Sequence, residues 1–391
     1  MVSTNIRNDQ SSLLVLISHI SVDPIQILAK NWSVSSSVCD WIGVTYGSRH
    51  HRVTALDISH LGLTGILPSH LGNLPFLVCL NTSRNSFHGG LPNEFPRLRR
   101  LKVLDLGYNR LSGEIPEWSG SFPKLQYLSL RDNSFTGLIP PSISNMSNLR
   151  SLYLSNNSLE GNIPGEIFNI SSLEMISLGD NRLSGSLPNY MCAHLPRLRV
   201  IALSKNELSG PIQSSLVQCS ELQVVSFSFN KFSGTIPKQL GKLKKLELIY
   251  FSRNKLVGEI PKQLGNSTML QFLDLAENHL TASMQIKDYA TPLPHISLTD
   301  ERGGPQSKSL SLHVYKPAVG ALAESFIPLE GCFHPENWTS KCSKEVVAPS
   351  TFSTTSREEE VVVLNSSLHN GDPEIAKFTL PFVGFNVDKA T

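Results

Sequence analysis

Residues that commonly do chemistry are present in this sequence, but their spacing completes no known site. His50 and His51 stand together in a loop-like stretch, and Cys332 and Cys342 flank His334. A zinc site would need a second close pair of ligands, which the sequence around these residues does not supply. The chain also contains no phosphate-loop, serine-elbow, metalloprotease or protein-kinase signature. We therefore expect no catalytic residue, no cofactor and no bound metal.

Composition and charge exclude two further classes of function. Lys plus Arg is 34 and Asp plus Glu is 32, a net charge of +2, which gives no field for attracting nucleic acid. The basic clusters at 97–102 and 238–245 have no interleaved aromatic residues for stacking bases. No apolar run reaches the 18 residues of a membrane span, and Leu13–Ile17 is too short for a signal segment. We expect neither a nucleic-acid partner nor membrane insertion by this chain.

The strongest pattern is a repeat of asparagine within L-x-x-L-x-L-x-x-N-x-L-x-G. The spacing is 24 residues throughout, except for 25 between Asn181 and Asn206. A degenerate copy that has Leu61 in place of Asn precedes the series. Internal periods of this length predict a solenoid of stacked units. The repeated residues are Asn85, Asn109, Asn133, Asn157, Asn181, Asn206, Asn230, Asn254 and Asn278.

Each copy can be interpreted as one coil. Leu104 and Leu106 alternate with a polar residue, which is typical of a short strand with one buried face. Asn109 follows, and its amide can satisfy turn backbone with both donor and acceptor. Gly113 permits a sharp turn, and Pro116 opens an extended segment on the convex side. Stacked coils would pair their strands into one parallel inner sheet at about 4.8 Å per step.

The chain divides into three parts. Residues 1–52 are predicted to form a cap over the first coil, with Asp9 at the N-cap of an apolar helix. Residues 53–281 hold ten repeats. Residues 282–391 lose the period and are rich in Ser, Thr and Pro, so we expect a tail of low order. Isolated strands at 361–364 and 378–385 are the exceptions that the tail's composition allows.

At this point the sequence resembles a known family. L-x-x-L-x-L-x-x-N-x-L-x-G-x-I-P is the plant-specific leucine-rich repeat. The segment with Asp23-Pro24, Asn31-Trp32-Ser33 and Cys39-Asp40-Trp41 is similar to the N-terminal cap of plant leucine-rich-repeat receptor kinases. The phrase from Gly47 to Leu56 looks most like the subfamily that holds the flagellin receptor and the rice blight-resistance receptor. The resemblance covers about residues 5–281.

The resemblance implies a function in signalling and a location. It implies the ligand-binding part of a plant immune or developmental receptor at the cell surface, with a peptide or protein ligand and a co-receptor kinase as partners. Family members continue into more repeats, a membrane helix and a Ser/Thr kinase, which are absent here, so a truncated ectodomain is expected. Two alternatives stay open: a secreted repeat protein of the polygalacturonase-inhibitor type, and a nonfunctional truncated product.

The inner sheet is the expected ligand surface. Residues that flank the core leucines of each strand should point away from the core, and large aromatic and guanidinium groups are typical of binding hot spots. An arc of ten strands could contact an extended peptide of about 15 residues. The predicted ligand-facing residues are Arg84, Asp105, Tyr108, Tyr127, Arg131, Tyr153, Asp180, Phe229, Tyr250, Arg253 and Phe272.

The six cysteines give one favoured disulfide. Cys192 and Cys219 occupy nearly the same phase of adjacent coils, which places them within disulfide reach, and the extra residue before Asn206 is consistent with a bulge there. Cys39 and Cys79 either pair with each other or stay free and buried, and we expect free thiols. Cys332 and Cys342 in the tail are a further candidate pair.

Eight N-x-[ST] sequences favour a secreted or cell-surface environment, although no signal segment is visible before the cap. Glycosylation at Asn156 would block part of the inner face. The predicted glycosylation sites outside the tail are Asn31, Asn81, Asn145, Asn156, Asn169 and Asn266.

Overall fold

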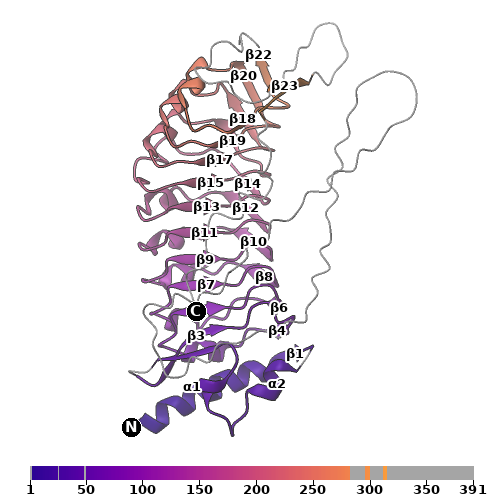
Figure 1. Ribbon diagram of the computed structural model, residues 1–391, viewed down its shortest axis with the longest axis vertical. Coiled ribbons are helices and arrows are strands. Elements are labelled where there is room, and N and C mark those ends of the chain that lie inside the picture. The colour runs from indigo at the N-terminus through magenta and orange to yellow at the C-terminus, as the bar shows by residue number, and fades with distance from the viewer. Residues whose placement is uncertain (1, 25, 48–49, 282–295, 300–310, 315–391) are drawn as a thin grey trace, which may run out of the picture. The chain divides into compact units, whose positions relative to one another are not determined.

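A computed structural model describes residues 2–24, 26–47, 50–281, 296–299 and 311–314. All of them belong to one compact unit, Met1–Glu345. Figure 1 shows the repeats of this unit stacked in chain order, one coil on the next. The predicted solenoid is confirmed. The predicted strands at 361–364 and 378–385, and the Cys332–Cys342 pair, lie outside the described residues.

The inner sheet contributes one short strand per repeat. Among the described residues it has 13 strands, and consecutive repeats pair in parallel without a crossover. Its repeat strands are β3 (Arg52–Asp57), β5 (Cys79–Asn81), β7 (Val103–Asp105), β9 (Tyr127–Ser129), β11 (Ser151–Tyr153), β13 (Met175–Ser177), β15 (Val200–Ala202), β17 (Val224–Ser226), β19 (Leu248–Tyr250) and β21 (Phe272–Asp274).

Two smaller sheets line a second side of the coils; their repeat strands pair in parallel, and a strand of the cap, β1 (Ile20–Val22), joins one of them antiparallel. Within the described part of the chain, one contains β1 (Ile20–Val22), β4 (Thr64–Ile66), β6 (Ser86–Gly89), β8 (Arg110–Glu114), β10 (Ser134–Leu138), β12 (Ser158–Asn162) and β14 (Arg182–Ser184). The other contains β16 (Ser209–Pro211), β18 (Lys231–Gly234), β20 (Lys255–Glu259) and β22 (His279–Thr281). An isolated bridge between Ser186 and Ser209 is what joins them, so the break falls in the 25-residue repeat.

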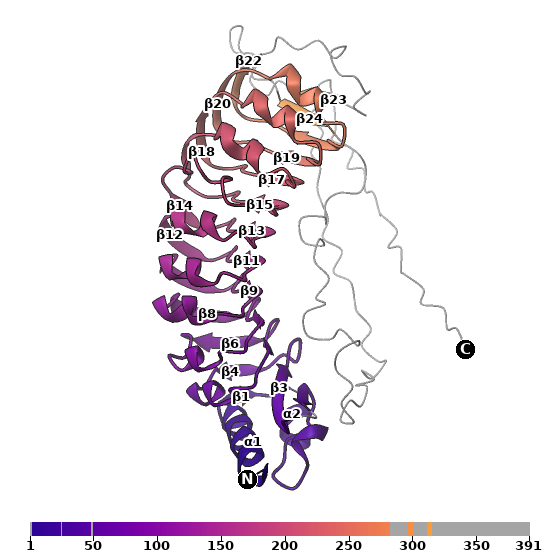
Figure 2. The same cartoon turned by 90° about the vertical axis from the view of Figure 1, so that its left-hand side faces the viewer.

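Short 3-10 helices lie on the side opposite the inner sheet in most coils, as Figure 2 shows. In most repeats the helix begins directly after a proline of the repeat motif. Proline favours an extended backbone before the helix and has no N–H to donate. They are η2 (Ser69–Asn73), η3 (Phe95–Arg97), η4 (Glu117–Ser121), η5 (Pro141–Asn145), η6 (Gly165–Asn169), η7 (Ser214–Gln218), η8 (Lys238–Lys242) and η9 (Lys262–Asn266).

The core between these layers is one continuous apolar column. Leu101, Leu104 and Leu106 of the third repeat are buried, as the alternation predicts. Leucines of every repeat join them. Two residues after the repeat asparagine, where the third repeat has Leu111, two other coils have Phe87 and Phe135. No single coil could cover this column, so its burial depends on the stacking of neighbours.

The repeat asparagines hold each turn together. The Nδ2 of Asn109 donates to the carbonyls of Leu106 and Gly107 in its own turn and to Thr82 in the preceding coil. Its Oδ1 accepts the N–H of Phe87, also in the preceding coil, at 2.9 Å. The other repeat asparagines make the same set of bonds. The amides are therefore linked through backbone groups rather than stacked directly on one another.

The N-terminal cap differs from its prediction at Asp9. The helix α1 spans Val2–Ser18, so Asp9 lies in its middle and is not an N-cap. Its carboxylate is 1 % exposed and binds the Arg52 guanidinium at 2.6 and 2.8 Å. The same carboxylate accepts the N–H of Val53 at 2.9 Å. The residue thus fastens the cap to the first inner strand.

The remainder of the cap covers the first coil. It contains α2 (Ile27–Asn31), η1 (Val38–Asp40) and β2 (Val44–Gly47), and β2 pairs antiparallel with β3 at the edge of the inner sheet. Trp32 and Trp41 stack with ring centroids 5.2 Å apart and are both buried. An antiparallel strand and two indole rings therefore close the end that the first coil would otherwise expose.

The other end of the inner sheet also gains strands that the sequence pattern did not indicate. β24 (Ser311–Val314) pairs antiparallel with β21 through Asp274 and His313, and β23 (Ile296–Thr299) pairs with β24. Both lie in the region for which low order was expected. β23 and β24 are short and lie outside the 24-residue repeat, so the repeat pattern could not predict them.

Candidate functional site: the inner face of the parallel sheet

The inner face presents side chains in rows because the strands pair in register. The first residue of each repeat strand, for example Val103 or Tyr127, lies beside its equivalent one coil away. The third residue, for example Asp105 or Ser129, forms a second row. A further row comes from the residue before each repeat asparagine. Equivalent residues in neighbouring coils are about 4.8 Å apart, so each row is a nearly continuous surface.

The row before the asparagines has an unusual backbone. Each of its residues has a positive φ between 52° and 58°, a conformation that only glycine adopts without strain. Arg84, Tyr108 and Phe229 belong to this row. Since every repeat shows it, the conformation is imposed by the turn rather than by one functional residue. It directs these side chains to the edge of the inner face.

Two apolar clusters run along the first and second rows. One contains Met175, Val200, Val224, Leu248 and Tyr153, with Tyr127, Tyr250 and Phe272 packed against it. The other joins Ala55, Cys79 and Val103 at the N-terminal end, and Tyr127 packs against it as well. The predicted aromatic residues Tyr127, Tyr153, Tyr250 and Phe272 are thus brought together in rows.

Aromatic and cationic groups interlock in the N-terminal half of this face. The rings of Tyr127 and Tyr153 lie 5.4 Å apart. Arg84 and Arg131 each place a guanidinium over the ring of Tyr108, at 4.3 and 4.7 Å from its centroid. Arg131 also lies 5.4 Å from the centroid of Tyr153. In the C-terminal half, Tyr250 packs on Phe272, and Arg253 lies over Phe229.

Two predicted ligand-facing residues are buried instead. Asp105 is 5 % exposed and Tyr153 is 8 % exposed. The Oδ1 of Asp105 accepts the N–H of Gly107 at 3.0 Å, so the carboxylate turns back towards its own loop. Tyr153 is covered because its ring lies 5.4 Å from that of Tyr127 and packs in a cluster with apolar residues of the first row. By contrast, Arg84, Asp180, Phe229 and Arg253 are exposed.

Burial dominates the electrostatics of these groups. Desolvation raises the pKa of Asp105, and the N–H of Gly107 and the charge of Arg131 offset only part of that rise. Desolvation also raises the pKa of Tyr127 and of Tyr153, so both phenols stay protonated. Burial and the neighbouring Arg84 lower the pKa of His60. None of these groups is paired in the way that a general acid or base would require.

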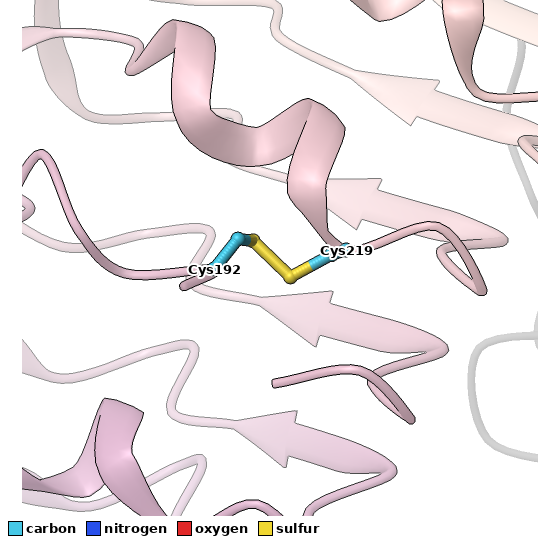
Figure 3. Close-up of a disulfide and its surroundings, with 2 residues drawn as sticks. All are labelled: Cys192 and Cys219. Carbon is cyan, nitrogen blue, oxygen red and sulfur yellow. A yellow bond between two sulfur atoms is a disulfide. The ribbon is translucent and has the colours of Figure 1, made fainter. Parts of the chain in front are cut away.

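Cys192 and Cys219, which occupy nearly the same position in adjacent coils, form the predicted disulfide. Their Cα atoms are 5.2 Å apart and both side chains are buried (Figure 3). Cys39 is a free, half-buried thiol, as expected. The free-thiol expectation is wrong for Cys79, which is disulfide-bonded and whose partner is not Cys39.

The predicted glycosylation sites separate into three groups. Asn145, Asn169 and Asn266 are exposed and end three of the 3-10 helices, in equivalent positions. Asn156 is exposed at the edge of the inner face, and Asn31 is half-buried in the cap.

Asn81 is a correction. It is 7 % exposed, and its amide is bonded to Asp57 and Ser83, which leaves no space for a glycan in the folded chain. The other five sites stay predictions.

Neither a metal site nor a membrane span is found in the described part of the chain. No group of three or more His, Cys, Asp or Glu residues there could hold a metal ion. None of the helices found among those residues has both the length and the apolar character that crossing a bilayer requires.

Comparison with known proteins agrees with this geometry. A leucine-rich-repeat model matches residues 99–159 and 123–183, and a second matches 221–243. A leucine-rich-repeat N-terminal domain model matches residues 6–45. The chain is therefore a leucine-rich-repeat protein with its N-terminal cap.

The relatives define its type more closely. The chain is 38 % identical over 88 residues to the LRR receptor-like serine/threonine-protein kinase EFR of Arabidopsis thaliana, a stretch that is 22 % of this chain and 8 % of that kinase. It aligns with the ectodomain of GASSHO1/SCHENGEN3 from Arabidopsis thaliana at 30 % identity and a TM-score of 0.65, covering 73 % of this chain and 37 % of the other. It aligns with the Arabidopsis receptor kinase HAESA at 31 % identity and a TM-score of 0.60. That alignment covers 70 % of this chain and 50 % of HAESA. Its repeats are those of plant leucine-rich-repeat receptor kinase ectodomains, and it spans half or less of each of these relatives.

Proposed function

We propose that this chain is a non-catalytic binding domain that takes up a peptide or protein ligand along its inner face. The observation that carries the proposal is the unbroken parallel run from β3 to β21, which sets aromatic and charged side chains in rows. Ten strands at about 4.8 Å offer a track for about 15 extended residues. Rigid rings and guanidinium groups on that track are the groups on which binding energy concentrates.

The solved relatives support a ligand-binding role. The GASSHO1/SCHENGEN3 ectodomain is in complex with CASPARIAN STRIP INTEGRITY FACTOR 2, and HAESA is in complex with the peptide hormone IDA and the co-receptor SERK1. By analogy, we assign this chain to plant cell-surface signalling, in immunity or development, in the subfamily of the flagellin receptor. A co-receptor kinase is then the second partner, and the kinase chemistry resides outside these repeats.

The experiment that tests the proposal uses the full chain. Random peptides of about 15 residues, displayed on phage, are selected on the immobilised protein, and the selected sequences are synthesised for calorimetry. Hydrogen exchange with and without peptide then maps the contact. We expect binding at a 1:1 ratio and slower exchange in the loops that follow β9 to β19.

Two matched tryptophan variants locate the site. Ser177 lies in the second row, which already carries Tyr153 and Tyr250 in other coils, so Ser177→Trp is sterically compatible with the fold. Ser171 is exposed in the turn after η6, away from the inner sheet. Ser177→Trp should weaken peptide binding at least tenfold, and Ser171→Trp should leave it unchanged. Equal effects of the two substitutions, or no selectable peptide, would reject the inner face as the binding site.

A further inference from the structure

We propose that Arg84 and Arg131 form an anion subsite that recognises two carboxylates, two residues apart, in an extended acidic peptide. The proposal rests on the function proposed above and names the chemistry of its ligand. Tyr108 is the positioning residue of the subsite. It holds one guanidinium from the coil before it and one from the coil after it.

The two guanidinium groups are held in place by ring contacts rather than by ion pairs. Each lies over the Tyr108 ring, at 4.3 Å for Arg84 and 4.7 Å for Arg131. A ring contact orients a guanidinium but leaves its N–H donors at the edge unused. Among the residues that the structure describes, neither arginine forms an ion pair or a side-chain hydrogen bond.

This arrangement differs from that of the cations in the repeats that form ion pairs. Five of them pair with an acid one coil away, within 4.0 Å: Arg150 with Glu174, Lys205 with Asp180, Lys231 with Glu207, Lys245 with Glu221 and Arg253 with Glu277. The stacking of coils can therefore supply a carboxylate to a cation. At Arg84 and Arg131 it supplies an aromatic ring instead.

The acids nearest to the subsite are already engaged. Asp105 is buried, and its Oδ1 accepts the N–H of Gly107. Asp132, the next residue after Arg131, accepts a hydrogen bond from the amide of Asn156 at 2.7 Å. Arg84 is exposed and Arg131 is partly exposed, so both can be reached by a ligand. Their positive charge is thus available to an anion from outside.

Spacing selects the ligand. Since both guanidinium carbons lie close to one ring centroid, they are at most about 9 Å apart. In an extended peptide, residues two apart point to the same side and are separated by about 6.6 Å. Acidic residues at positions i and i+2 can therefore each meet one guanidinium, with the bidentate geometry that arginine offers to a carboxylate. Adjacent acidic residues would point to opposite sides.

The test uses three 12-residue synthetic peptides with blocked ends and a fluorescent label. One alternates Ser and Glu, one repeats Ser-Ser-Glu-Glu and so carries the same charge, and one alternates Ser and Gln. Anisotropy is measured with the full chain. We expect the alternating Ser-Glu peptide to bind at least fivefold more tightly than the Ser-Ser-Glu-Glu peptide, and the Ser-Gln peptide to bind more weakly than both.

Variants separate the subsite from general charge. The double substitution R84Q/R131Q should weaken binding of the alternating acidic peptide at least tenfold. K231Q/K245Q removes the same charge from two paired lysines and should change it less than twofold. Y108L keeps both arginines but removes the ring, and should lose affinity that Y108F retains. Circular dichroism and thermal melting check that each variant is folded.

Equal binding of the two acidic peptides, or equal effects of the two double variants, would overturn the subsite. That result would leave the proposed function in place if peptides selected from the random library still bind and are blocked by Ser177→Trp. Failure of both experiments would reject the inner face as a binding surface altogether.

Discussion

At the scale of single residues, the buried pair of Asp9 and Arg52 is the most consequential contact of the cap. It joins the middle of α1 to the first inner strand through two charge-assisted bonds and one bond to backbone. Breaking a buried ion pair leaves an uncompensated charge, which is costly, whereas exposed pairs contribute little. The two kinds of pair can be compared directly in this chain.

Asp9→Asn should lower the free energy of unfolding by about 3–5 kcal/mol. Glu221→Gln is the matched control, because it breaks a pair that is equally short, at 2.6 Å, but exposed. It should cost less than about 1 kcal/mol. Urea denaturation followed by circular dichroism measures both. Similar losses in the two variants would mean that Arg52 finds another partner when Asp9 is removed.

The pH dependence of stability should reveal Asp105. Burial raises the pKa of this carboxyl above its ordinary value of 3.8, so the folded chain holds the proton more strongly than the unfolded chain. Such a group lowers stability as the pH rises above the unfolded value, and has no such effect at lower pH. Asp105→Asn keeps the oxygen that accepts from Gly107, and Asn81 already occupies the equivalent place in its own coil.

We therefore expect Asp105→Asn to be more stable than the parent chain at pH 7, with a difference that shrinks as the pH falls towards 4. Denaturant midpoints at several pH values measure this difference. Asn81→Asp should show the opposite trend, since it adds a carboxylate to the same buried row. A stability difference that stays constant across the pH range would show that folding does not change the pKa of Asp105.

At the scale of elements, the disulfide lies where the structure most needs support. The repeat with one extra residue interrupts the second sheet, and the bridge between Ser186 and Ser209 is its remaining link. Cys192 and Cys219 close a loop across the same place, at a sequence separation of 27. Cross-linking a loop of this size restricts the unfolded chain considerably.

Replacing both cysteines by alanine should lower the free energy of unfolding by about 2–4 kcal/mol. Reduction of the parent chain should give at least this loss, because the reductant also opens the disulfide of Cys79, whereas in the double variant it opens only the disulfide of Cys79. Thermal melting with and without a phosphine reductant makes the comparison. If reduction lowers the stability of the parent chain no more than that of the double variant, the Cys192–Cys219 bridge contributes no stability.

The sequence allowed the elements to be predicted where one residue type repeats for one physical reason. The 24-residue period of leucine and asparagine located every repeat strand, because each coil must bury the same face and close the same turn. It could not reveal the Asp9–Arg52 pair, since the helix begins seven residues earlier than its polar N-cap candidate indicated. It also missed the burial of Asp105 and Tyr153, because alternation shows which side a residue faces and not what lies beside it.

At the scale of the whole solenoid, the C-terminal end is where solubility is decided. The last repeat buries Leu273, Leu275 and Leu280, and β21 pairs with β24 along its outer edge. An unpaired strand edge next to an apolar core promotes association between chains. A chain that ends at Thr281 would lose β24 and expose that edge.

Residues 1–281 expressed alone should therefore form dimers or aggregates, while the full chain should be monomeric under the same conditions. Light scattering after size-exclusion chromatography gives both masses. Introducing a charge at the edge by Phe272→Lys should restore the monomer to the shortened chain. A monomeric 1–281 without such a change would show that β23 and β24 are dispensable.

The direction of the asparagine bonds sets an order of events during synthesis. Asn109 supplies its oxygen to Phe87 and part of its amide to Thr82, and both of these backbone groups were translated earlier. A newly made turn on the ribosome is thus only finished once roughly another two dozen residues have left the exit tunnel. Each newly folded coil therefore completes the hydrogen bonds of the coil before it. A translational pause inside a repeat would leave one unfinished turn exposed to chaperones, whereas the turns made before it would already be secured.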